Sequence, residues 1–242
     1  MVSVSVIVCC YNDGRFLGRA LESLCRQTLP RDQFELVMVN DGSSDETESV
    51  ALSYDERLNL KYVKNDVNKG LTASCNLGLR HATGKYVIRL DADDFFDTTI
   101  LEKMSNALNS HMNAFVYSDR LESLEATRET RHVSLAEFSV FKLIACGTML
   151  RTDEVVQIGG YRSIFWEEYD LYMRYLMITD KQPFYISQPL YIYTIRPGSM
   201  TADGGRIKQG WRELKELWPE SALAKFGPLP LAASQDDIPT IK

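Results

Sequence analysis

The sequence predicts an α/β protein with a mostly parallel central sheet. Short apolar, β-rich runs alternate with segments whose apolar residues recur every three or four positions. The first run, 4–9, ends in the turn sequence 12–14. A helix follows, with an apolar face over 17–24, and Pro30 stops this segment. This alternation is typical of a Rossmann-type α/β/α sandwich, in which helices cover both faces of the sheet.

The alternation continues to residue 90. Further strands are expected over 34–39, 60–63 and 86–90, with a helix over 71–82. Ser43 and Glu46 have the spacing of a capping box for the helix between the second and third strands. The pattern predicts two strand–helix units followed by two more strands around a third helix.

The second half of the chain is less regular. We expect a helix near 101–109, a strand near 115–117 and an exposed charged hairpin or loop over 119–131. Apolar strand character returns over 145–150, and Trp166 leads into another helix.

Composition excludes some classes of function. The net charge of −6 argues against non-specific nucleic-acid binding, which needs a basic surface. The five cysteines have neither metal-ligand spacing nor the density of a disulfide scaffold. No apolar stretch reaches the length of a membrane span, so we expect a cytoplasmic protein, with peripheral attachment to the inner face of the membrane left open.

The C-terminal segment carries an apolar stripe at helical spacing, formed by Ile207, Trp211, Leu214 and Trp218. It predicts an amphipathic helix over 204–226. Docking of this helix on the main domain is favoured, and contact with a lipid surface or a second copy of the chain is the alternative. Prolines and small or acidic residues over 227–242 predict a flexible tail.

The most informative motif is the run Leu90-Asp91-Ala92-Asp93-Asp94, which follows the strand over 86–90. Carboxylates this close together raise one another's pKa unless a cation or hydrogen-bond donors compensate them. Mg²⁺ or Mn²⁺ is the natural compensator, since these ions take one or two carboxylates together with substrate phosphates. The alternative is a polar turn before a helix capped by Thr99 and Glu102.

Three loops are expected to meet at one edge of the sheet. Tyr11, Asp41 and Asp91 each follow a predicted parallel strand. Ligands of such sheets bind beyond the carboxyl ends of the strands, where these loops converge. The sequence therefore predicts a nucleotide site at this edge.

The order of these motifs resembles that of the inverting family-2 glycosyltransferases over about residues 3 to 201. The resemblance rests on 6–12, 40–45, 68–84, 90–94 and, further along, on Gly159-Gly160-Tyr161, Glu167 to Leu171 and Arg196 to Ser199. It implies a GT-A-like fold over 1–203, with a nucleotide-sugar half over about 1–94 and an acceptor half over about 95–203. The implied reaction is metal-dependent, inverting transfer of a sugar from a nucleoside-diphosphate sugar, with uridine as the favoured base.

The resemblance also implies roles for individual residues at the donor end. Cys10 and Tyr11 would border the base, and Asp41 would accept hydrogen bonds from it. Asp91 would lie near the ribose and diphosphate. Asp93 would bind Mn²⁺ or Mg²⁺, while Asp94 would brace the loop.

Two basic residues complete the donor end. Arg196, where many family members have histidine, would clamp phosphate through its guanidinium. Lys69 would add positive charge near the nucleotide, or is a solvated surface lysine.

An inverting transfer needs one general base, and the acidic cluster over 167–170 contains the candidates. Glu168 is the favoured general base, although family members commonly have aspartate at this position. The helix dipole would keep the Glu168 carboxylate ionised. Asp170, paired with Arg174 four positions on, would have an orienting role. The choice between Glu168 and Asp170 stays open.

Departures from the family pattern leave a second reading open. The departures are Glu168, Arg196 and Cys75, the last of which stands where arginine is frequent in the family. The alternative that they leave open is a catalytically inactive nucleotide-sugar-binding module. A sugar-nucleotide pyrophosphorylase is disfavoured, since the loop over 10–14 has a single glycine. The acceptor is undetermined: cell-envelope polysaccharide, a lipid-linked oligosaccharide, another glycoconjugate or a protein.

Overall fold

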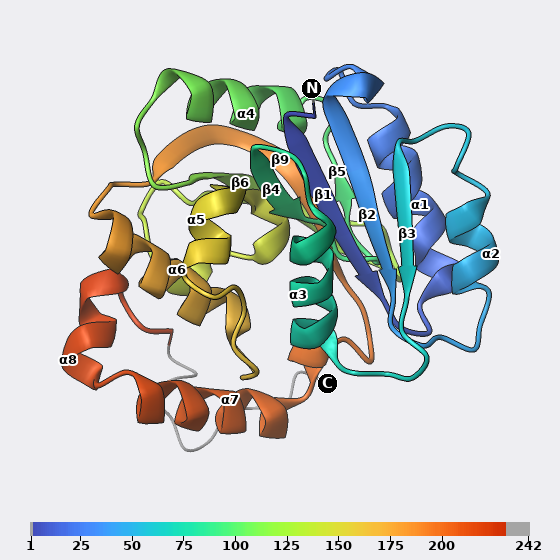
Figure 1. Ribbon diagram of the computed structural model, residues 1–242. Helices are drawn as coiled ribbons and strands as arrows, with labels where there is room; N and C mark the ends of the chain where they lie inside the picture. The colour runs from blue at the N-terminus through green and yellow to red at the C-terminus, as the bar shows by residue number, and fades with distance from the viewer. Residues whose placement is uncertain (1, 231–242) are drawn as a thin grey trace.

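The computed structural model describes residues 2–230 and shows a helix-covered, nine-stranded sheet (Figure 1). The strand order is β3-β2-β1-β4-β8-β6-β9-β5, with β7 paired to β6. The strands are β1 Val4–Cys10, β2 Phe34–Asn40, β3 Leu60–Lys64, β4 Tyr86–Arg89, β5 Phe95–Phe96, β6 Val116–Leu124, β7 Thr130–Val133, β8 Thr148–Arg151 and β9 Phe184–Ile195. Strands β1 to β4 are mutually parallel, and β6 and β9 also pair in parallel. The predicted mostly parallel α/β sheet is confirmed.

Helices cover both faces of the sheet. They are α1 Gly14–Cys25, α2 Thr47–Leu52, α3 Leu71–His81, α4 Ile100–Ser110, α5 Thr152–Gln157, α6 Glu167–Thr179, α7 Gly204–Leu217 and α8 Glu220–Leu223. Side chains alternate between the faces of a strand, so in β1 Val6 and Val8 join one core with α1 and α4, whereas Ile7 joins the other with α3 and α6. This is the α/β/α arrangement that the alternating pattern predicts.

Both predicted capping boxes are wrong. Before α2, Asp45 Oδ1 accepts from the Thr47 backbone N–H at 3.0 Å and from its hydroxyl at 2.6 Å. Before α4, Asp97 Oδ1 makes the same pair of contacts with Thr99 at 2.9 and 2.6 Å. In each case an aspartate two residues upstream of the threonine forms a local Asx-type turn. The Ser43 N–H, which the first box would have used, donates to Asn40 Oδ1 at 2.9 Å, and the Thr99 N–H of the second is taken by Asp97.

The irregular half contains elements beyond those predicted. The charged segment does form a hairpin, β6 and β7, but β6 runs on to Leu124 and is partly buried. Its Asp119 is 1% exposed, because Oδ1 accepts from the Leu135 backbone at 2.7 Å and from the Tyr185 hydroxyl at 2.7 Å. The long strand β9 lies beside β6 and closes this part of the sheet (Figure 1).

The C-terminal helix docks on the domain, as favoured from its apolar stripe. Trp211 and Leu214 are buried, and the Trp211 ring lies 5.7 Å from that of Phe141 and 5.5 Å from that of Trp166. The predicted single helix over 204–226 is wrong, because α7 ends at Leu217 and Pro219 precedes the separate short helix α8. Contact with a lipid surface or a second copy stays a prediction.

Two expectations concern the ends and the membrane. Of the flexible tail expected over 227–242, residues 231–242 lie outside the described residues, while Leu229 packs against the core that contains α6. Within residues 2–230, every helix is too short or too polar to cross a bilayer.

We expect Trp211→Ala to lower the free energy of unfolding by about 3–5 kcal/mol, because it removes a buried aromatic side chain and leaves a cavity. Urea denaturation followed by circular dichroism measures this change. Leu217→Ala in the same helix is the control, since Leu217 is 47% exposed. Equal urea midpoints for the two variants would show that α7 does not depend on docking.

Candidate functional site

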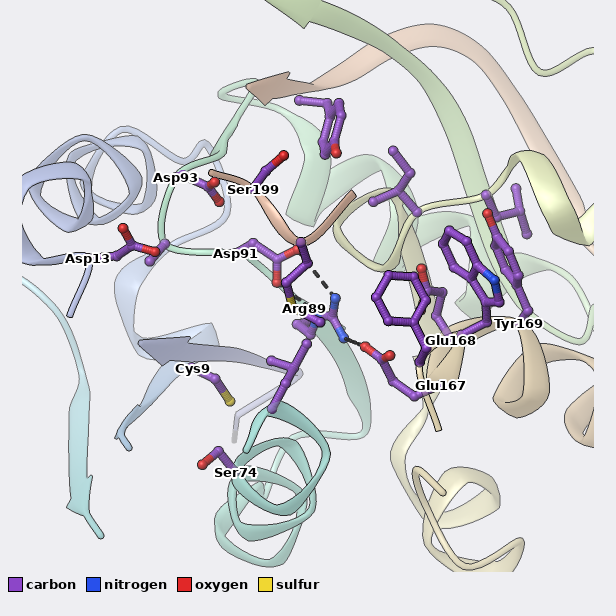
Figure 2. Close-up of a pocket in the computed structure, with 18 of the residues that line it drawn as sticks. Cys9, Asp13, Ser74, Arg89, Asp91, Asp93, Glu167, Glu168, Tyr169 and Ser199 are labelled. Atoms are coloured by element: carbon purple, nitrogen blue, oxygen red, sulfur yellow. Dashed lines mark hydrogen bonds and ion pairs between the residues drawn. The ribbon is translucent and has the colours of Figure 1, made fainter. Parts of the chain in front are cut away.

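One pocket of about 820 Å³ opens at the carboxyl ends of β1, β2 and β4 and extends to the first turn of α6. It brings together residues that are far apart in the sequence, and Figure 2 shows Asp91 and Asp93 on one side and Glu168 on the other. Of the predicted site residues, those that line this pocket are Cys10, Tyr11, Asp41, Asp91, Asp93 and Glu168. The predicted meeting of the loops at Tyr11, Asp41 and Asp91 is confirmed.

The end of the pocket beside β1 is bordered by Tyr11 and Cys10. Tyr11 is 48% exposed, so its ring is available to a ligand. Cys10 is buried, and burial raises the pKa of its thiol to about 11, so it is neutral at pH 7. The two residues offer a flat ring and an uncharged wall, which suit a nucleobase.

Asp41 holds the loop that forms the adjacent wall. Its Oδ1 accepts from Asn65 Nδ2 at 2.8 Å and from the Lys69 backbone N–H at 2.9 Å, while Oδ2 accepts from the Gly70 backbone N–H at 2.9 Å. Gly42 lets this loop approach, since its φ is +74° and a Cβ there would meet backbone atoms of Val67 at 2.6 Å. Asp41 therefore shapes the pocket through the chain over 65–70 and also faces it.

Lys69 reaches Asp41 through its backbone. Its side chain is exposed and is not among those that line the pocket. The structure therefore places it as a surface lysine, and any contact with nucleotide stays a prediction.

The three aspartates that follow β4 have different partners. Asp91 forms a two-point ion pair with Arg89, with Nε–Oδ1 at 2.9 Å and Nη2–Oδ2 at 3.3 Å. Asp93 Oδ2 accepts from Arg196 Nε at 2.6 Å. Asp94 is 1% exposed, and its Oδ1 accepts from the Thr194 backbone N–H at 2.7 Å. Asp94 thus braces the loop from inside.

Arg196 connects two of the loops that border the pocket. Its Nη2 lies 2.7 Å from Asp13 Oδ2, in addition to the contact with Asp93. The guanidinium thus lies between the loops that follow β1 and β4. Arg196 is not among the residues that line the pocket, and its side chain is 10% exposed. Its contact with a phosphate oxygen therefore stays a prediction.

Two places in the structure are candidates for binding a divalent cation. Asp91, Asp94 and Cys146 place ligand atoms within 4.8 Å of one another. However, Asp94 already accepts a hydrogen bond from the Thr194 backbone N–H. Burial also raises the pKa of the Cys146 thiol, which disfavours the thiolate that a metal would need. Asp93 fits better, because it lines the pocket and because burial and Asp91 raise its pKa in spite of Arg196. Its negative charge is therefore only partly compensated, as expected of a carboxylate that shares a hard cation with phosphate.

At the far side of the pocket, the first turn of α6 presents Glu168. Burial and the neighbouring Glu167 raise the pKa of Glu168 well above its usual value. The helix dipole was expected to favour the ionised form, but desolvation and like charge outweigh it and raise the pKa. Glu168 is suited to accept a proton once it is deprotonated.

Asp170 lies away from the pocket and is fully buried. Its Oδ2 accepts from Arg174 Nε at 2.8 Å, which confirms the pair expected from their spacing. Its Oδ1 accepts from Trp218 Nε1 at 2.9 Å and from Arg162 at 3.3 Å. Asp170 thus orients α6 and anchors the end of α7.

Arg89 was missed from the sequence, and Glu167, although part of the acidic cluster over 167–170, was given no role of its own. Arg89 is 7% exposed at the end of β4, and Glu167 is 3% exposed and pairs with it at 2.9 Å. An arginine within the apolar strand 86–90 is the one available signal, because a buried guanidinium needs carboxylate partners.

The fold and the site are those of a GT-A-type protein, in which a pocket lies at the carboxyl ends of the parallel strands. The chain belongs to glycosyl transferase family 2, whose model matches residues 5–182. It is 33% identical over 112 residues to poly(ribitol-phosphate) beta-N-acetylglucosaminyltransferase TarS of Staphylococcus aureus, covering 46% of this chain and 20% of TarS. It is 31% identical over 185 residues to the putative glycosyltransferase EpsE of Bacillus subtilis, covering 71% of this chain and 66% of EpsE.

Solved structures show the same fold. Residues 1–349 of S. aureus TarS in complex with UDP-GlcNAc give a TM-score of 0.76 at 21% identity, over 93% of this chain and 71% of that one. The mannosyltransferase PcManGT of Pyrobaculum calidifontis, in complex with GDP-Man and Mn²⁺, gives 0.71 at 18% identity, over 95% and 66%. The GT-A fold and the family of glycosyltransferases are therefore established for this chain, which spans about a fifth of TarS.

We expect Asp41→Ala to speed hydrogen exchange at the Lys69 amide, because it removes the acceptor of that N–H and leaves donors unpaired at about 1–3 kcal/mol each. Exchange followed by NMR in the absence of ligand measures the effect. Asp66→Ala, an exposed change in the same loop, is the control. Unchanged protection of Lys69 would contradict the role of Asp41 in this wall.

Proposed function

We propose that this protein transfers a sugar with inversion from a UDP-sugar to an acceptor hydroxyl, with Mn²⁺ or Mg²⁺ as cofactor. The observation that carries the proposal is the single pocket in which Tyr11, Asp93 and Glu168 meet. It joins a surface for a nucleobase, a carboxylate for a cation and, opposite them, the half-buried carboxyl group of Glu168. Membership of glycosyl transferase family 2 and the donor complexes of the structural neighbours support it.

We assign the nucleobase of the donor a position against the ring of Tyr11. Stacking on an aromatic ring contributes about 1–3 kcal/mol per base in single-stranded nucleic-acid sites, and the exposed Tyr11 ring offers such a surface. Asp41 Oδ2 accepts a hydrogen bond from one backbone N–H, that of Gly70, and can accept a further one from the nucleobase. Asp91 borders the ribose and diphosphate.

Negative charge grows on the diphosphate as the bond to the sugar breaks. Arg196, at the junction of two loops, is placed to donate to these oxygens. A divalent cation bound by Asp93 would supply further positive charge at the leaving group, which stabilises the transition state more than the ground state.

Glu168 is assigned as the general base. It lines the pocket on the side opposite the aspartate loop, where an acceptor hydroxyl would approach the sugar from the face away from the diphosphate. Asp170 has no access to that hydroxyl, since it is buried and bonded to Arg174 and Trp218. We assign it the positioning of α6.

The acceptor is proposed to be a cell-envelope polysaccharide or glycoconjugate. Beyond Glu168 the pocket is lined by the rings of Phe165, Trp166 and Tyr169. Aromatic rings present broad apolar surface with polar edges, which suits the faces of sugar rings. The poly(ribitol-phosphate) named as the acceptor polymer of TarS supports this class.

We expect the purified protein to release a nucleoside diphosphate from a UDP-sugar only with Mn²⁺ or Mg²⁺. Asp93→Ala should lower this release at least about tenfold, equivalent to about 1.4 kcal/mol of transition-state stabilisation, and abolish the metal-dependent thermal shift given by UDP. Asp55→Ala, which removes an exposed carboxylate, is the control. Binding without turnover across a broad panel of donors and acceptors would instead favour the inactive nucleotide-sugar-binding module.

The raised pKa of Glu168 gives the transfer rate a specific pH dependence. A general base works deprotonated, so kcat should rise with pH until the pKa is passed, by about tenfold per pH unit below it. The rising limb should lie above the range of an ordinary glutamate. Initial rates over a pH series with saturating donor measure it.

The matched variants are Glu168→Gln and Glu168→Asp. The amide should lose about 10²–10⁴-fold in kcat together with the rising limb, because it cannot accept the proton. Aspartate keeps a carboxylate and should retain part of the rate. A glutamine variant with an unaltered pH profile would exclude Glu168 as the base.

A further inference from the structure

We propose that Arg89 is a positioning residue of the transfer: from the end of β4 it ties Asp91, on the donor side, to the first turn of α6, and so fixes Glu168 on the acceptor side. The inference rests on the proposed function and adds to it a residue to which the family resemblance gave no role. Figure 2 shows the Arg89 guanidinium between Asp91 and Glu167.

The guanidinium donates a hydrogen bond to each carboxylate, through Nη1 to Glu167 and through Nη2 to Asp91. Its Nε forms only an ion pair with Asp91, without the geometry of a hydrogen bond. Nε and Nη2 face the two oxygens of Asp91 at 2.9 and 3.3 Å, and Nη1 lies 2.9 Å from Glu167 Oε1. The side chains of Arg89 and Glu167 are 7% and 4% exposed, whereas that of Asp91 is 28% exposed to the pocket. Because the contact is directional at both ends, a shift of α6 or of the aspartate loop would break it.

A purely structural role explains this arrangement less well. Taking a guanidinium and two carboxylates out of water costs several kcal/mol per ion, and apolar packing of similar volume is often as stable or more so. Arg89, Asp91 and Glu167 all line the pocket. A charged link that lies along the floor of the site, and not in the core, points to a role in the reaction.

Cys75 is part of the same arrangement. Its Sγ lies 4.0 Å from Arg89 Nη1, so the short side chain on α3 leaves the space that the guanidinium occupies.

The charge of Arg89 also acts on Glu168. Burial, Glu167 and Asp91 raise the pKa of Glu168, and Arg89 opposes them. Tyr169 and Tyr172, on the same helix α6, also interact electrostatically with Glu168. Loss of Arg89 would therefore raise the pKa of Glu168 further and leave less of the base deprotonated at a given pH.

The experiment compares Arg89→Met and Arg89→Lys with Arg80→Gln, a change of an exposed arginine on α3. Nucleotide release with UDP-sugar and Mn²⁺ is measured over a pH series. Arg89→Met should lower kcat by about tenfold or more with a smaller change in the KM for donor, and move the rising limb to higher pH. Arg89→Lys, which keeps the charge without the two-point contact, should move the limb less.

Adding Cys75→Arg to Arg89→Met returns a guanidinium to the site from α3. Partial recovery of kcat and a return of the rising limb toward lower pH are expected. A kcat and pH profile of Arg89→Met equal to those of Arg80→Gln would overturn the proposal. The proposal would also be overturned if Arg89→Met lost kcat only in proportion to a lower urea midpoint and kept the wild-type pH profile.

Failure of the proposed function is recognised separately, because the wild-type protein would then release no nucleotide with any donor. In that case ¹³C NMR titration of the Glu168 carboxyl still tests the coupling to Arg89. A higher pKa in Arg89→Met than in wild type supports it, and an equal pKa overturns it. Should Arg89→Met not fold, the same titration in Arg89→Gln decides, since the glutamine amide removes the charge but keeps hydrogen-bonding groups beside the two carboxylates.

Discussion

Negative charge crowded around one pocket is the constraint on which the site depends. Asp13, Asp91, Asp93, Glu167 and Glu168 all border the same space, and the fold sets Arg89 and Arg196 against them. Each guanidinium joins two carboxylates from different segments of the chain. The balance is incomplete, since the pKa values of Asp93 and Glu168 stay raised. Arg120, Lys142 and Arg206 also line the pocket and add positive charge. The proposed cation would supply the further positive charge that a diphosphate beside Asp93 needs.

The first half of the fold was predictable because its strands are buried on both faces. Uninterrupted apolar runs such as β2 Phe34–Asn40 mark such strands, and the three-and-four spacing marks the helices between them. Strand β9 was missed for a physical reason. Pro189 interrupts its pattern, and the pairing with β6 shifts register around Asp119, so no period of two runs through it. Its place is set by tertiary pairing and not by local sequence.

The same distinction separates the parts of the site. Tyr11, Asp41 and Asp91 were predictable because position after a parallel strand is a property of the sequence. The pairing of Arg196 with Asp93 joins residues 103 positions apart in the sequence, and nothing local indicates it. The ionisation of Glu168 was predicted in the wrong direction, because the helix dipole is visible in the sequence whereas burial beside Glu167 is not.

The first turn of α6 shows how helical geometry divides three nearby acids among three tasks. Successive side chains are rotated by about 100°, so Glu167 and Glu168 diverge and Asp170 lies about 200° from Glu168. Glu167 therefore meets Arg89 beneath the pocket, Glu168 enters the pocket, and Asp170 turns back to Arg174 and Trp218. A base in this turn is fixed from two sides, through Asp170 to α7 and through Glu167 to β4. The position of Glu168 in the pocket thus depends on the contacts of its two neighbours, Glu167 and Asp170, with other elements of the fold.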